Sequence, residues 1–366
     1  MTGSSNEATL RCLTLTGTPY ERGVTHGEAF SDEISHNLDT YLETFTYCGV
    51  EESAVYEMAE QFVDVIATAN ESYYEEMQGI ADASDCSLVD ITVLNARYEV
   101  LYGAWHTEAA DLADGCTAFG ARPEITANGH TIIGQNWDWL VPLSTFVMEL
   151  RRDTAPDMLV MTEAGIVGGK VGFNEHGIGM LLNGLVTADD GEEPFRTPYH
   201  VRFREVLDSA RFDHAIGALL TENRACSANV ILGHAQGELI DLELGPTTAN
   251  HIFPDDRTHL LTHANHLEGP EMESRLEIRS PDTLCRSNRL RRLLLQEGTE
   301  LSVEAAQAVL QDHFGRPKSI CRHPDETEDE LDRTQTKGSF VIDLTERRFV
   351  VTDGPPCERE YAELQL

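Results

Sequence analysis

The chain has 366 residues, enough to bury a large core, and its 27 Lys and Arg against 63 Asp and Glu give a formal net charge of −36. So acidic a chain lacks the basic footprint that nucleic-acid binding requires, and no run approaches the ~18 apolar residues of a membrane span. Its lysines are Lys170, Lys318 and Lys337 alone. Acidic excess with scarce lysine predicts a surface adapted to a high-salt cytoplasm, because salt screens the repulsion between like charges.

The cysteines favour a reduced, cytoplasmic protein. None of the eight belongs to a Cys-x-x-Cys motif, and they are spread over the whole chain. Met1 to Arg11 contains no apolar core of a signal peptide. We therefore expect free thiols and a cytoplasmic location. The cysteines are Cys12, Cys48, Cys86, Cys116, Cys226, Cys285, Cys321 and Cys357.

The first part of the chain is predicted to be helical after one strand. Leu10 to Leu15 has the composition of a strand, whereas Ser31 to Gly103 repeats apolar residues at helical spacing. Between them, Gly23 and Gly27 lie four residues apart at the start of a helix. Small residues at this spacing permit close packing, so a purely structural role is expected for this pair.

The next segment, Asp114-Gly115-Cys116-Thr117, places a cysteine directly behind a glycine. The turn Ala127-Asn128-Gly129 then reverses the chain, so that Gln135-Asn136-Trp137-Asp138-Trp139 returns beside the cysteine. This hairpin is predicted to bring a thiol, a carboxamide and a carboxylate together. The polar connector Trp105 to Ala113 suits a segment that is cut and moved aside. The alternative is a buried cysteine in a strand, because free cysteines are among the most buried residues.

Strands and helices alternate in the rest of the chain. One hairpin from Ala228 to Leu244 turns at Gln236-Gly237, and a last hairpin runs from Ser339 to Thr352. Two blocks of strands flanked by helices indicate an α+β layered fold. Further strands are predicted at Phe146 to Leu150, Met158 to Met161, twice within Gly168 to Val186 and at His259 to His263. Helices are predicted at Leu88 to Tyr102, before the Gly-Cys segment, and after it at Pro198 to Ser209, His214 to Thr221, Pro281 to Gln296 and Val303 to His313.

The Gly115–Cys116 bond permits a specific chemistry. A cysteine thiol can attack the preceding carbonyl through a five-membered ring, and the resulting thioester is hydrolysed more readily than an amide. Glycine before the cysteine lets the backbone distort. The freed α-amine, whose ordinary pKa is about 8, then lies beside its own thiol and can act as its base near neutral pH. Such a nucleophile requires no histidine.

These motifs resemble those of the acyl-coenzyme A:6-aminopenicillanic-acid acyltransferase (isopenicillin N acyltransferase) family, which are cysteine N-terminal-nucleophile hydrolases. In that family a precursor cuts itself between Gly and Cys, and the Cys becomes both the new N-terminus and the nucleophile. The resemblance runs from about Gly17 to Thr352. Its anchors are the stretch Tyr20 to Gly27, Gly115-Cys116-Thr117 with Asn136-Trp137-Asp138, then His263-Ala264-Asn265-His266, and Ser319-Ile320-Cys321-Arg322.

The resemblance implies a four-layer αββα sandwich with an N-terminal helical segment. Residues 1–115 would be a pro-segment or small subunit integral to the fold, and residues 116–366 the catalytic large subunit. Cleavage between Gly115 and Cys116 would leave an αβ heterodimer.

The resemblance also implies roles for single residues. Cys116 would be the nucleophile, and Asn265 would donate to the oxyanion that develops on the substrate. Asp138 would hold the α-amine and the processing geometry, with Arg322 neutralising or orienting this carboxylate. The supporting residues would be Asn136, Thr117 and His266.

Structural alternatives remain open for several of these positions. Asn265 follows a strand, where Asn is common in turns, and Arg322 could form an ordinary surface ion pair. The cluster Arg286 to Arg292 is interpreted as a solvated helix face rather than a coenzyme A phosphate site, because no Gly-rich phosphate loop is present. His263 and His266 lack further ligands at a familiar spacing, so no metal or other cofactor is expected.

These features predict a self-processing cysteine amidohydrolase or acyltransferase that acts on a non-peptide amide through an acyl-thioester enzyme. The expected partner is a small-molecule amide or acyl thioester, with a coenzyme A thioester among the candidates, and neither nucleic acid nor a membrane. One alternative is an amidase of the bile-salt hydrolase and penicillin V acylase kind, although those lack a long N-terminal segment and 115 residues precede Cys116 here. The other is an uncleaved, catalytically silent binding homologue.

Overall fold

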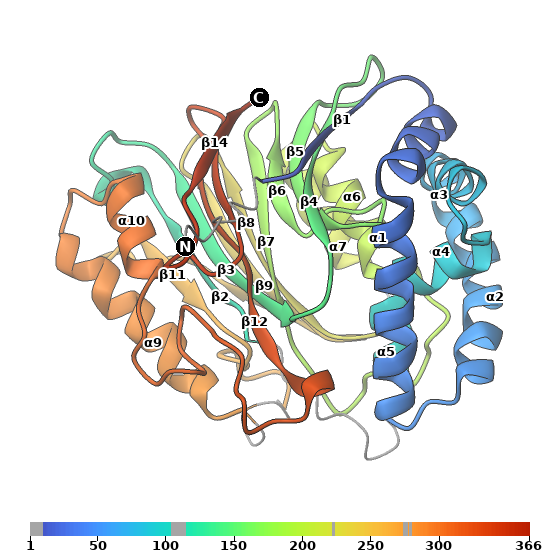
Figure 1. The fold of residues 1–366 in the computed structure, drawn as a ribbon. Coiled ribbons are helices and arrows are strands. Elements are labelled where there is room, and N and C mark those ends of the chain that lie inside the picture. The colour runs from blue at the N-terminus through green and yellow to red at the C-terminus, as the bar shows by residue number, and fades with distance from the viewer. Residues whose placement is uncertain (1–9, 104–114, 222–223, 274–276, 278–279) are drawn as a thin grey trace, which may run out of the picture.

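The computed structural model describes residues 10–103, 115–221, 224–273, 277 and 280–366 (Figure 1). The predicted connector Trp105 to Ala113 lies outside these residues. Two sheets stand at the centre of the molecule, and helices cover the outer side of each (Figure 1).

The larger sheet contains the strands in the order β1-β4-β5-β6-β7-β8-β9-β10. β1 pairs in parallel with β4, so the N-terminal part of the chain is joined to this sheet, and the other neighbours pair antiparallel. Its strands are β1 (Cys12–Leu15), β4 (Thr145–Leu150), β5 (Met158–Glu163), β6 (Val171–Asn174), β7 (Ile178–Gly184), β8 (Ala228–His234), β9 (Leu239–Leu244) and β10 (Ala249–Ile252).

The smaller sheet is antiparallel and has the order β11-β2-β3-β12-β13-β14. It faces the larger sheet closely: a Cβ on Gly179 of β7 would lie 2.9 Å from Ile133 of β3. Its strands are β2 (Thr117–Ala121), β3 (Ile132–Leu140), β11 (Leu260–His263), β12 (Thr334–Asp343), β13 (Arg348–Asp353) and β14 (Ala362–Gln365).

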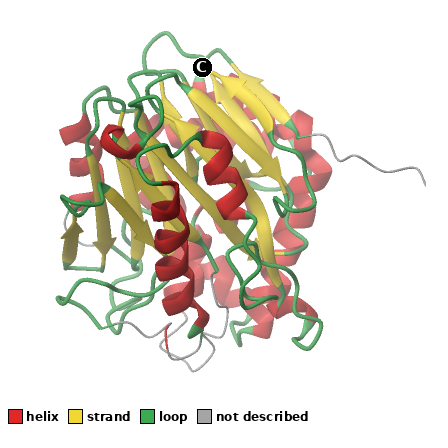
Figure 2. Cartoon of the chain, turned by 90° about the vertical axis from the view of Figure 1, so that its left-hand side faces the viewer, coloured by secondary structure: helices red, strands yellow, loops and turns green. Residues whose placement is uncertain are grey.

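Helices form the two outer layers. α9 and α10 cover the smaller sheet, and Figure 2 shows them in front of its strands. The remaining helices lie on the side of the larger sheet (Figure 1). The predicted αββα sandwich is therefore confirmed. The helices are α1 (Pro19–Tyr47), α2 (Glu52–Ala69), α3 (Glu71–Ala83), α4 (Leu88–Asn95), α5 (Arg97–Gly103), α6 (Tyr199–Leu207), α7 (Phe212–Leu220), α9 (Asp282–Leu294) and α10 (Val303–Leu310).

The first helix begins with strong local signals and then packs tightly on α3. Thr18 and Glu21 form a reciprocal capping box at its start. A Cβ on Gly23 would lie only 2.0 Å from the carbonyl oxygen of Glu76 in α3, and one on Gly27 would lie 2.7 Å from that of Ile80. The expected structural role of this glycine pair is thus confirmed, since no larger side chain fits between the two backbones.

The clearest differences from the predicted elements are one interrupted helix and two strands that were not predicted. The helix expected from Leu88 to Tyr102 is interrupted at Ala96, which separates α4 from α5. The short strands β10 and β14 were not predicted, because both lie at the edge of a sheet and expose part of their residues to solvent. Within the described ranges, no helix is both long and apolar enough to cross a membrane.

Candidate active site

Cys116 lies immediately before β2. Its side chain is fully buried, and its Sγ lies 3.7 Å from the backbone oxygen of Asp138. Thr117 pairs with Asn136 across β2 and β3, as the predicted hairpin requires. On β2, Thr117 points toward α9, whereas a Cβ on Gly120 would touch the larger sheet. Because side chains alternate along a strand, Cys116 belongs to the face between the two sheets.

Asp138 and Asn136 lie on the opposite face of β3, toward the α10 layer. The Asn136 amide donates to the backbone oxygens of Leu310 and Ile320, both at 2.8 Å. Thr336 donates to Asp138 Oδ1 at 2.6 Å. The hairpin therefore brings the three predicted groups into one region, but the carboxylate and the carboxamide lie behind the backbone rather than beside the thiol.

Arg322 connects Asp138 to the predicted cleavage site. Its Nε lies 3.3 Å from Asp138 Oδ2, and its Nη2 lies 2.8 Å from Asp282 Oδ2. A Cβ on Gly115 would lie 2.2 Å from Arg322 Nε, so any larger residue at this position would displace the Arg322 side chain. Arg322 is buried, and the alternative of an ordinary surface ion pair is therefore wrong.

Arg286 makes the closest polar contacts with the cleavage site. Its Nη1 donates to the backbone oxygens of Gly115 and Cys116, each at 2.5 Å, and to Thr117 Oγ1 at 2.8 Å. Its Nη2 donates to Asn265 Oδ1 at 2.9 Å. The interpretation of this arginine as part of a solvated helix face is wrong, because Arg286 is buried.

The sequence carried a weak signal for Arg286. Arg286 and Leu290 lie one helical turn apart on the buried face of α9, together with Thr283. A charged residue on the apolar face of a helix is expected to have a partner of opposite charge. That partner is Asp282, which accepts from Arg286 Nε at 2.9 Å. Burial opposes the ionisation of Asp282, but Arg286 and Arg322 lower its pKa, so it remains a carboxylate between two guanidinium groups.

Asn265 is held in one orientation by three contacts. Arg286 donates to its Oδ1, its Nδ2 donates to the backbone oxygen of Gly184 at 3.1 Å, and its backbone N–H donates to Thr283 Oγ1 at 2.7 Å. Since the oxygen faces a guanidinium, the amide N–H₂ group must face the other way. Asn265 follows the end of β11, and its side chain is fully buried rather than exposed as in an ordinary surface turn.

Sequence comparison places these residues in a known family. The family model described as "Acyl-coenzyme A:6-aminopenicillanic acid acyl-transferase" matches residues 125–351. The chain is 30% identical, over 353 residues, to the 40 kDa form of acyl-coenzyme A:6-aminopenicillanic-acid-acyltransferase from Emericella nidulans, covering 94% of this chain and 92% of that protein. The chain belongs to the acyl-coenzyme A:6-aminopenicillanic-acid acyltransferase family. It is an enzyme of the acyltransferase and N-terminal-nucleophile hydrolase class.

Two solved structures show a partial likeness to this family member. The N-acylethanolamine-hydrolyzing acid amidase ortholog of Caenorhabditis elegans has a TM-score of 0.47 at 16% identity, covering 63% of this chain and 93% of that one. A mutant of conjugated bile acid hydrolase from Clostridium perfringens has a TM-score of 0.45 at 12% identity, covering 68% of this chain and 92% of that one. The family assignment rests on the sequence matches.

His266, predicted to support the site of this acyltransferase-family enzyme, is buried beside Asn265. Its Nδ1 lies 3.0 Å from Thr283 Oγ1, and its ring stacks on that of His263 at 6.1 Å. Burial, together with the charges of His263 and Arg286, lowers the pKa of His266 to about 4. The ring is therefore neutral near pH 7 and contributes no positive charge to the site.

A buried polar network that the sequence did not predict crosses the space between the sheets. Gln135 donates to Asn183 Oδ1 at 2.9 Å, Asn183 donates to Asn229 Oδ1 at 2.7 Å, and Asn229 donates to Asp241. Burial raises the pKa of Asp241 to about 7. This network joins β3, directly beside Asn136, to β7, β8 and β9.

His263, the last residue of β11, is fully buried and lies near Asp241 at the end of this polar network. Burial alone would lower its pKa, but the nearby carboxylates of Asp241 and Glu243 outweigh this effect and raise the pKa of His263 to about 9. Its Nε2 lies 2.9 Å from Glu243 Oε1. Glu243 also accepts from the backbone N–H of Gly269 at 3.0 Å. His263 therefore forms an internal ion pair with Glu243.

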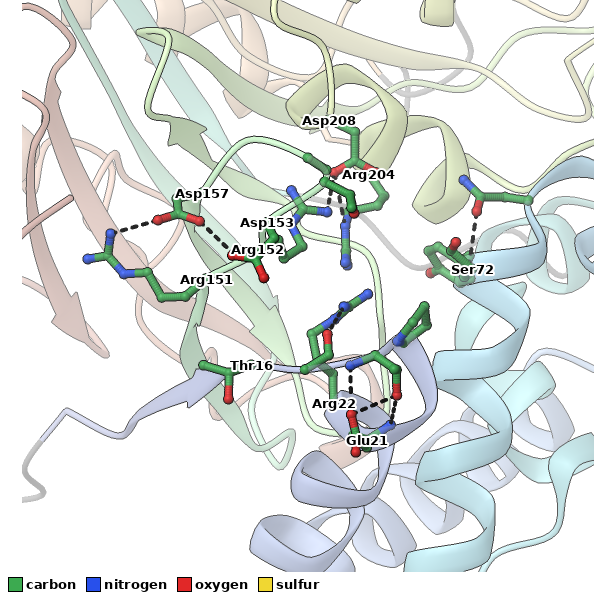
Figure 3. Close-up of a pocket in the computed structure, with 17 residues that line it drawn as sticks. Thr16, Glu21, Arg22, Ser72, Arg151, Arg152, Asp153, Asp157, Arg204 and Asp208 are labelled. Carbon is green, nitrogen blue, oxygen red and sulfur yellow. Dashed lines mark hydrogen bonds and ion pairs between the residues drawn. The ribbon is translucent and has the colours of Figure 1, made fainter.

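A large cavity of about 920 Å³ lies elsewhere in the molecule, between the starts of α1 and α3 and the segment that joins β4 to β5 (Figure 3). None of the predicted site residues is among the described residues that line it. Its arginines are already paired with carboxylates: Arg22 with Glu76 at 2.8 Å and Arg151 with Asp157 at 3.0 Å. Arg152 and Arg204 are paired in the same way with Asp208 and Glu76, so the cavity does not present free cations to a phosphate.

Proposed function

We propose that this family member cuts its own chain between Gly115 and Cys116 and then uses Cys116 as the nucleophile of an amide hydrolase or acyltransferase. The observation that carries the proposal is the contact between the Arg286 guanidinium and the Gly115 carbonyl oxygen at 2.5 Å. A buried cation at this oxygen stabilises the negative charge that develops when a nucleophile attacks the carbonyl carbon. Glycine at this position leaves room for the neighbouring Arg322 side chain.

The proposed processing step conserves every atom of the chain and adds one water. The Cys116 sulfur forms a bond to the Gly115 carbonyl carbon, the carbon–nitrogen bond breaks, and the thiol proton passes to the departing amine. Water then hydrolyses the thioester, leaving a Gly115 carboxylate and a Cys116 with a free thiol and a free α-amine. Asp138, 3.3 Å from Arg322, offers a carboxylate that can hold the new ammonium group.

Turnover uses the same sulfur. The α-amine accepts the thiol proton, the thiolate attacks the substrate carbonyl, and the proton then passes to the leaving amine. Asn265 serves as the oxyanion donor, because Arg286 fixes its oxygen and thereby directs its N–H₂ group. Water or a second amine resolves the acyl thioester. The proposed substrate is a small-molecule amide.

Intact-mass measurement of protein purified in high salt tests the processing step. The uncut chain has a mass of 40.6 kDa, and cleavage should give fragments of roughly 13 and 28 kDa that remain associated as a heterodimer. Cys116→Ala should stay at full mass and lose all turnover, since it lacks the attacking sulfur. A wild-type chain that stays at full mass after prolonged incubation contradicts self-processing and supports an uncleaved binding homologue.

Asn265→Ala separates processing from turnover. Its proposed donor acts on the substrate oxyanion, so the chain should still be cut while turnover falls about 100- to 1,000-fold. Full activity in this variant would show that another group supplies the donor. Asp138→Asn should impair both steps, because the same α-amine and thiol take part in each.

The assay also distinguishes hydrolysis from acyl transfer. The name of the Emericella nidulans relative suggests an acyl-coenzyme A donor and 6-aminopenicillanic acid as the acceptor, and these are the first pair to test. Release of free acid from a simple N-acyl amide, unchanged by added amine, supports a hydrolase. A new amide that forms only when the acceptor amine is present supports a transferase.

A further inference from the structure

Two cysteines and two histidines converge at one point near the end of the smaller sheet. Cys321 and His323 flank Arg322, and His313 belongs to the same loop, which follows α10. Cys357 comes from the segment between β13 and β14. The four ligand atoms all lie within 4.8 Å of one another. Two parts of the chain therefore bring together the ligand types of a zinc site.

Four distances between the ligand atoms lie close to those of a tetrahedral ion. Zinc–sulfur bonds of about 2.3 Å and zinc–nitrogen bonds of about 2.0 Å place tetrahedral ligand atoms roughly 3.3 to 3.8 Å apart. The two sulfurs lie 3.5 Å apart, and His323 Nε2 lies 3.6 Å from Cys321 Sγ and 3.4 Å from Cys357 Sγ. His313 Nε2 and His323 Nε2 lie 3.1 Å apart. A metal ion at the centre would account for all of these close approaches.

The surroundings support ligation by His323 through Nε2. Glu358 Oε1 lies 3.4 Å from the other ring nitrogen, Nδ1. A carboxylate beside the second nitrogen of a metal-binding histidine fixes the tautomer that leaves the first nitrogen free for the metal. Backbone hydrogen bonds also hold the loop: Cys321 donates to Asp312 at 3.0 Å, and His323 donates to Pro317 at 3.0 Å.

We propose that His313, Cys321, His323 and Cys357 bind one zinc ion in a closed, structural Cys₂His₂ site. Four protein ligands leave no open position for substrate or water, so the site holds the fold together and takes no part in the reaction. It ties the segment after β13 to the loop that carries Arg322. Since Arg322 stands between two ligands and contacts both Gly115 and Asp138, zinc would position this arginine at the active site.

The spacing of the ligands explains why the sequence did not indicate this site. Cys321 and His323 are separated by one residue, His313 precedes them by eight, and Cys357 follows by more than thirty. No familiar zinc motif has this pattern. A disulfide between Cys321 and Cys357 is the competing use of the two sulfurs, but it would give no role to the two histidines that meet them.

Metal analysis of the purified protein tests the proposal. The wild-type chain, prepared without chelators, should contain one zinc per chain, and Cys357→Ser and His313→Asn should retain much less after dialysis. Both residues are exposed, so these changes leave the core intact. Cys12→Ser and His251→Asn, which alter exposed residues outside the cluster, are the matched controls and should keep their zinc. Equal zinc content in all five proteins, or none in the wild type, would overturn the proposal.

Cobalt substitution provides an independent spectroscopic test. Cobalt in this site should show the intense visible bands of a tetrahedral ion and a thiolate-to-metal charge-transfer band that weakens in Cys357→Ser. Glu358→Gln should keep the spectrum but bind the metal about 10- to 100-fold more weakly, since only the supporting carboxylate is lost. A denatured wild-type chain that is two hydrogens lighter than its sequence, with no metal, would show a disulfide instead.

The same measurements on the Cys116→Ala chain separate this inference from the proposed catalytic function. That variant lacks the predicted nucleophile but keeps all four ligands, so it should still contain one zinc. Chelation should lower the Tm of Cys116→Ala and leave that of the Cys116→Ala, Cys357→Ser double variant unchanged. Failure of self-cleavage with zinc retained would therefore contradict only the catalytic proposal.

Discussion

At the scale of single residues, two arginines define the polar surroundings of Gly115. Arg322 occupies the space that a Cβ on Gly115 would need, and Arg286 donates to the Gly115 carbonyl oxygen. Asp282 accepts from both guanidinium groups, at 2.9 Å from Arg286 and 2.8 Å from Arg322. The two cations are therefore held in fixed positions by a shared carboxylate, as the proposed stabilisation of an oxyanion at Gly115 would require.

Asp241 is the residue whose ionisation should be visible in stability. Burial raises its pKa to about 7 from an ordinary value near 4. Between these values the folded chain binds more protons than the unfolded chain, so the contribution of Asp241 to stability falls as pH rises from about 4 to about 7. Asp241→Asn removes this effect while keeping an acceptor for Asn229. The Tm of the variant should therefore rise relative to wild type across this window.

The comparison with wild type at each pH cancels the contributions of titrating groups that do not interact with Asp241, whereas His263 and Glu243 are coupled to it. His263 belongs to the same measured effect, because the Asp241 carboxylate helps to raise its pKa, and its Nε2 lies 2.9 Å from Glu243 Oε1. A Tm difference that stays constant from pH 4 to 7 would show that Asp241 is not protonated preferentially in the folded chain.

At the scale of elements, the two faces of β3 contact different layers: one faces the larger sheet and the other faces the α10 layer. Gln135 on one face begins the polar network that reaches β7 and β8. Asn136 and Asp138 on the other face bind the α10 layer and Thr336. A shift of one residue in the register of β3 would exchange these two sets, so the pairing with β2 and β12 determines which groups surround Cys116.

The contact between α1 and α3 gives a prediction for Gly79. A Cβ at this position would lie 2.2 Å from the backbone oxygen of Tyr20 and 2.8 Å from the backbone nitrogen of Val24. Neither atom belongs to a flexible side chain, so Gly79→Ala must push the helices apart and should lower the free energy of unfolding by about 1–3 kcal/mol.

Gly217 provides the matched control for this substitution. It lies in α7, is exposed, and has no atom within 4 Å of an added Cβ. Gly217→Ala should therefore raise the free energy of unfolding by about 0.5–1 kcal/mol, because alanine loses less conformational freedom in a helix. Denaturant titration of both variants checks the pair. Equal effects would show that the α1–α3 interface adapts to a side chain.

At the scale of the whole molecule, the negative charge lies at the surface. Among the described residues, nine Lys and Arg side chains and eight Asp and Glu side chains are buried. The positive and negative charges of these buried residues thus nearly cancel. The acidic excess that underlies the formal charge of −36 lies outside the core. Burial of scarce cations makes the surface more acidic than the composition alone suggests.

This distribution predicts a strong dependence of stability on salt. Repulsion between exposed carboxylates should destabilise the folded chain at low ionic strength, where charges interact over longer distances. The Tm should rise steeply between low and molar KCl and then level off. Sucrose at matched osmolality is the control, since it strengthens burial without screening charge. Equal melting temperatures at low and molar KCl would contradict the proposed adaptation to high salt.

The sequence by itself determined the elements and the family because both depend on local patterns. Apolar periodicity predicted most helices and strands, and the turn at Gln236-Gly237 lies between β8 and β9 as expected. The Gly115-Cys116-Thr117 and Asn136-Trp137-Asp138 motifs identified the family and the paired strands around the predicted nucleophile. These signals lie within short stretches of chain, so they can be recognised without knowing the fold.

Only the tertiary structure decided which distant groups meet. Arg286 comes from α9, more than 160 residues beyond Cys116, and its role depends on which face of that helix is buried. The convergence of Cys321 and Cys357 likewise depends on how two loops cross at the end of a sheet. Such contacts have no signature in spacing or composition, because they arise from the packing of layers whose relative positions no local pattern encodes.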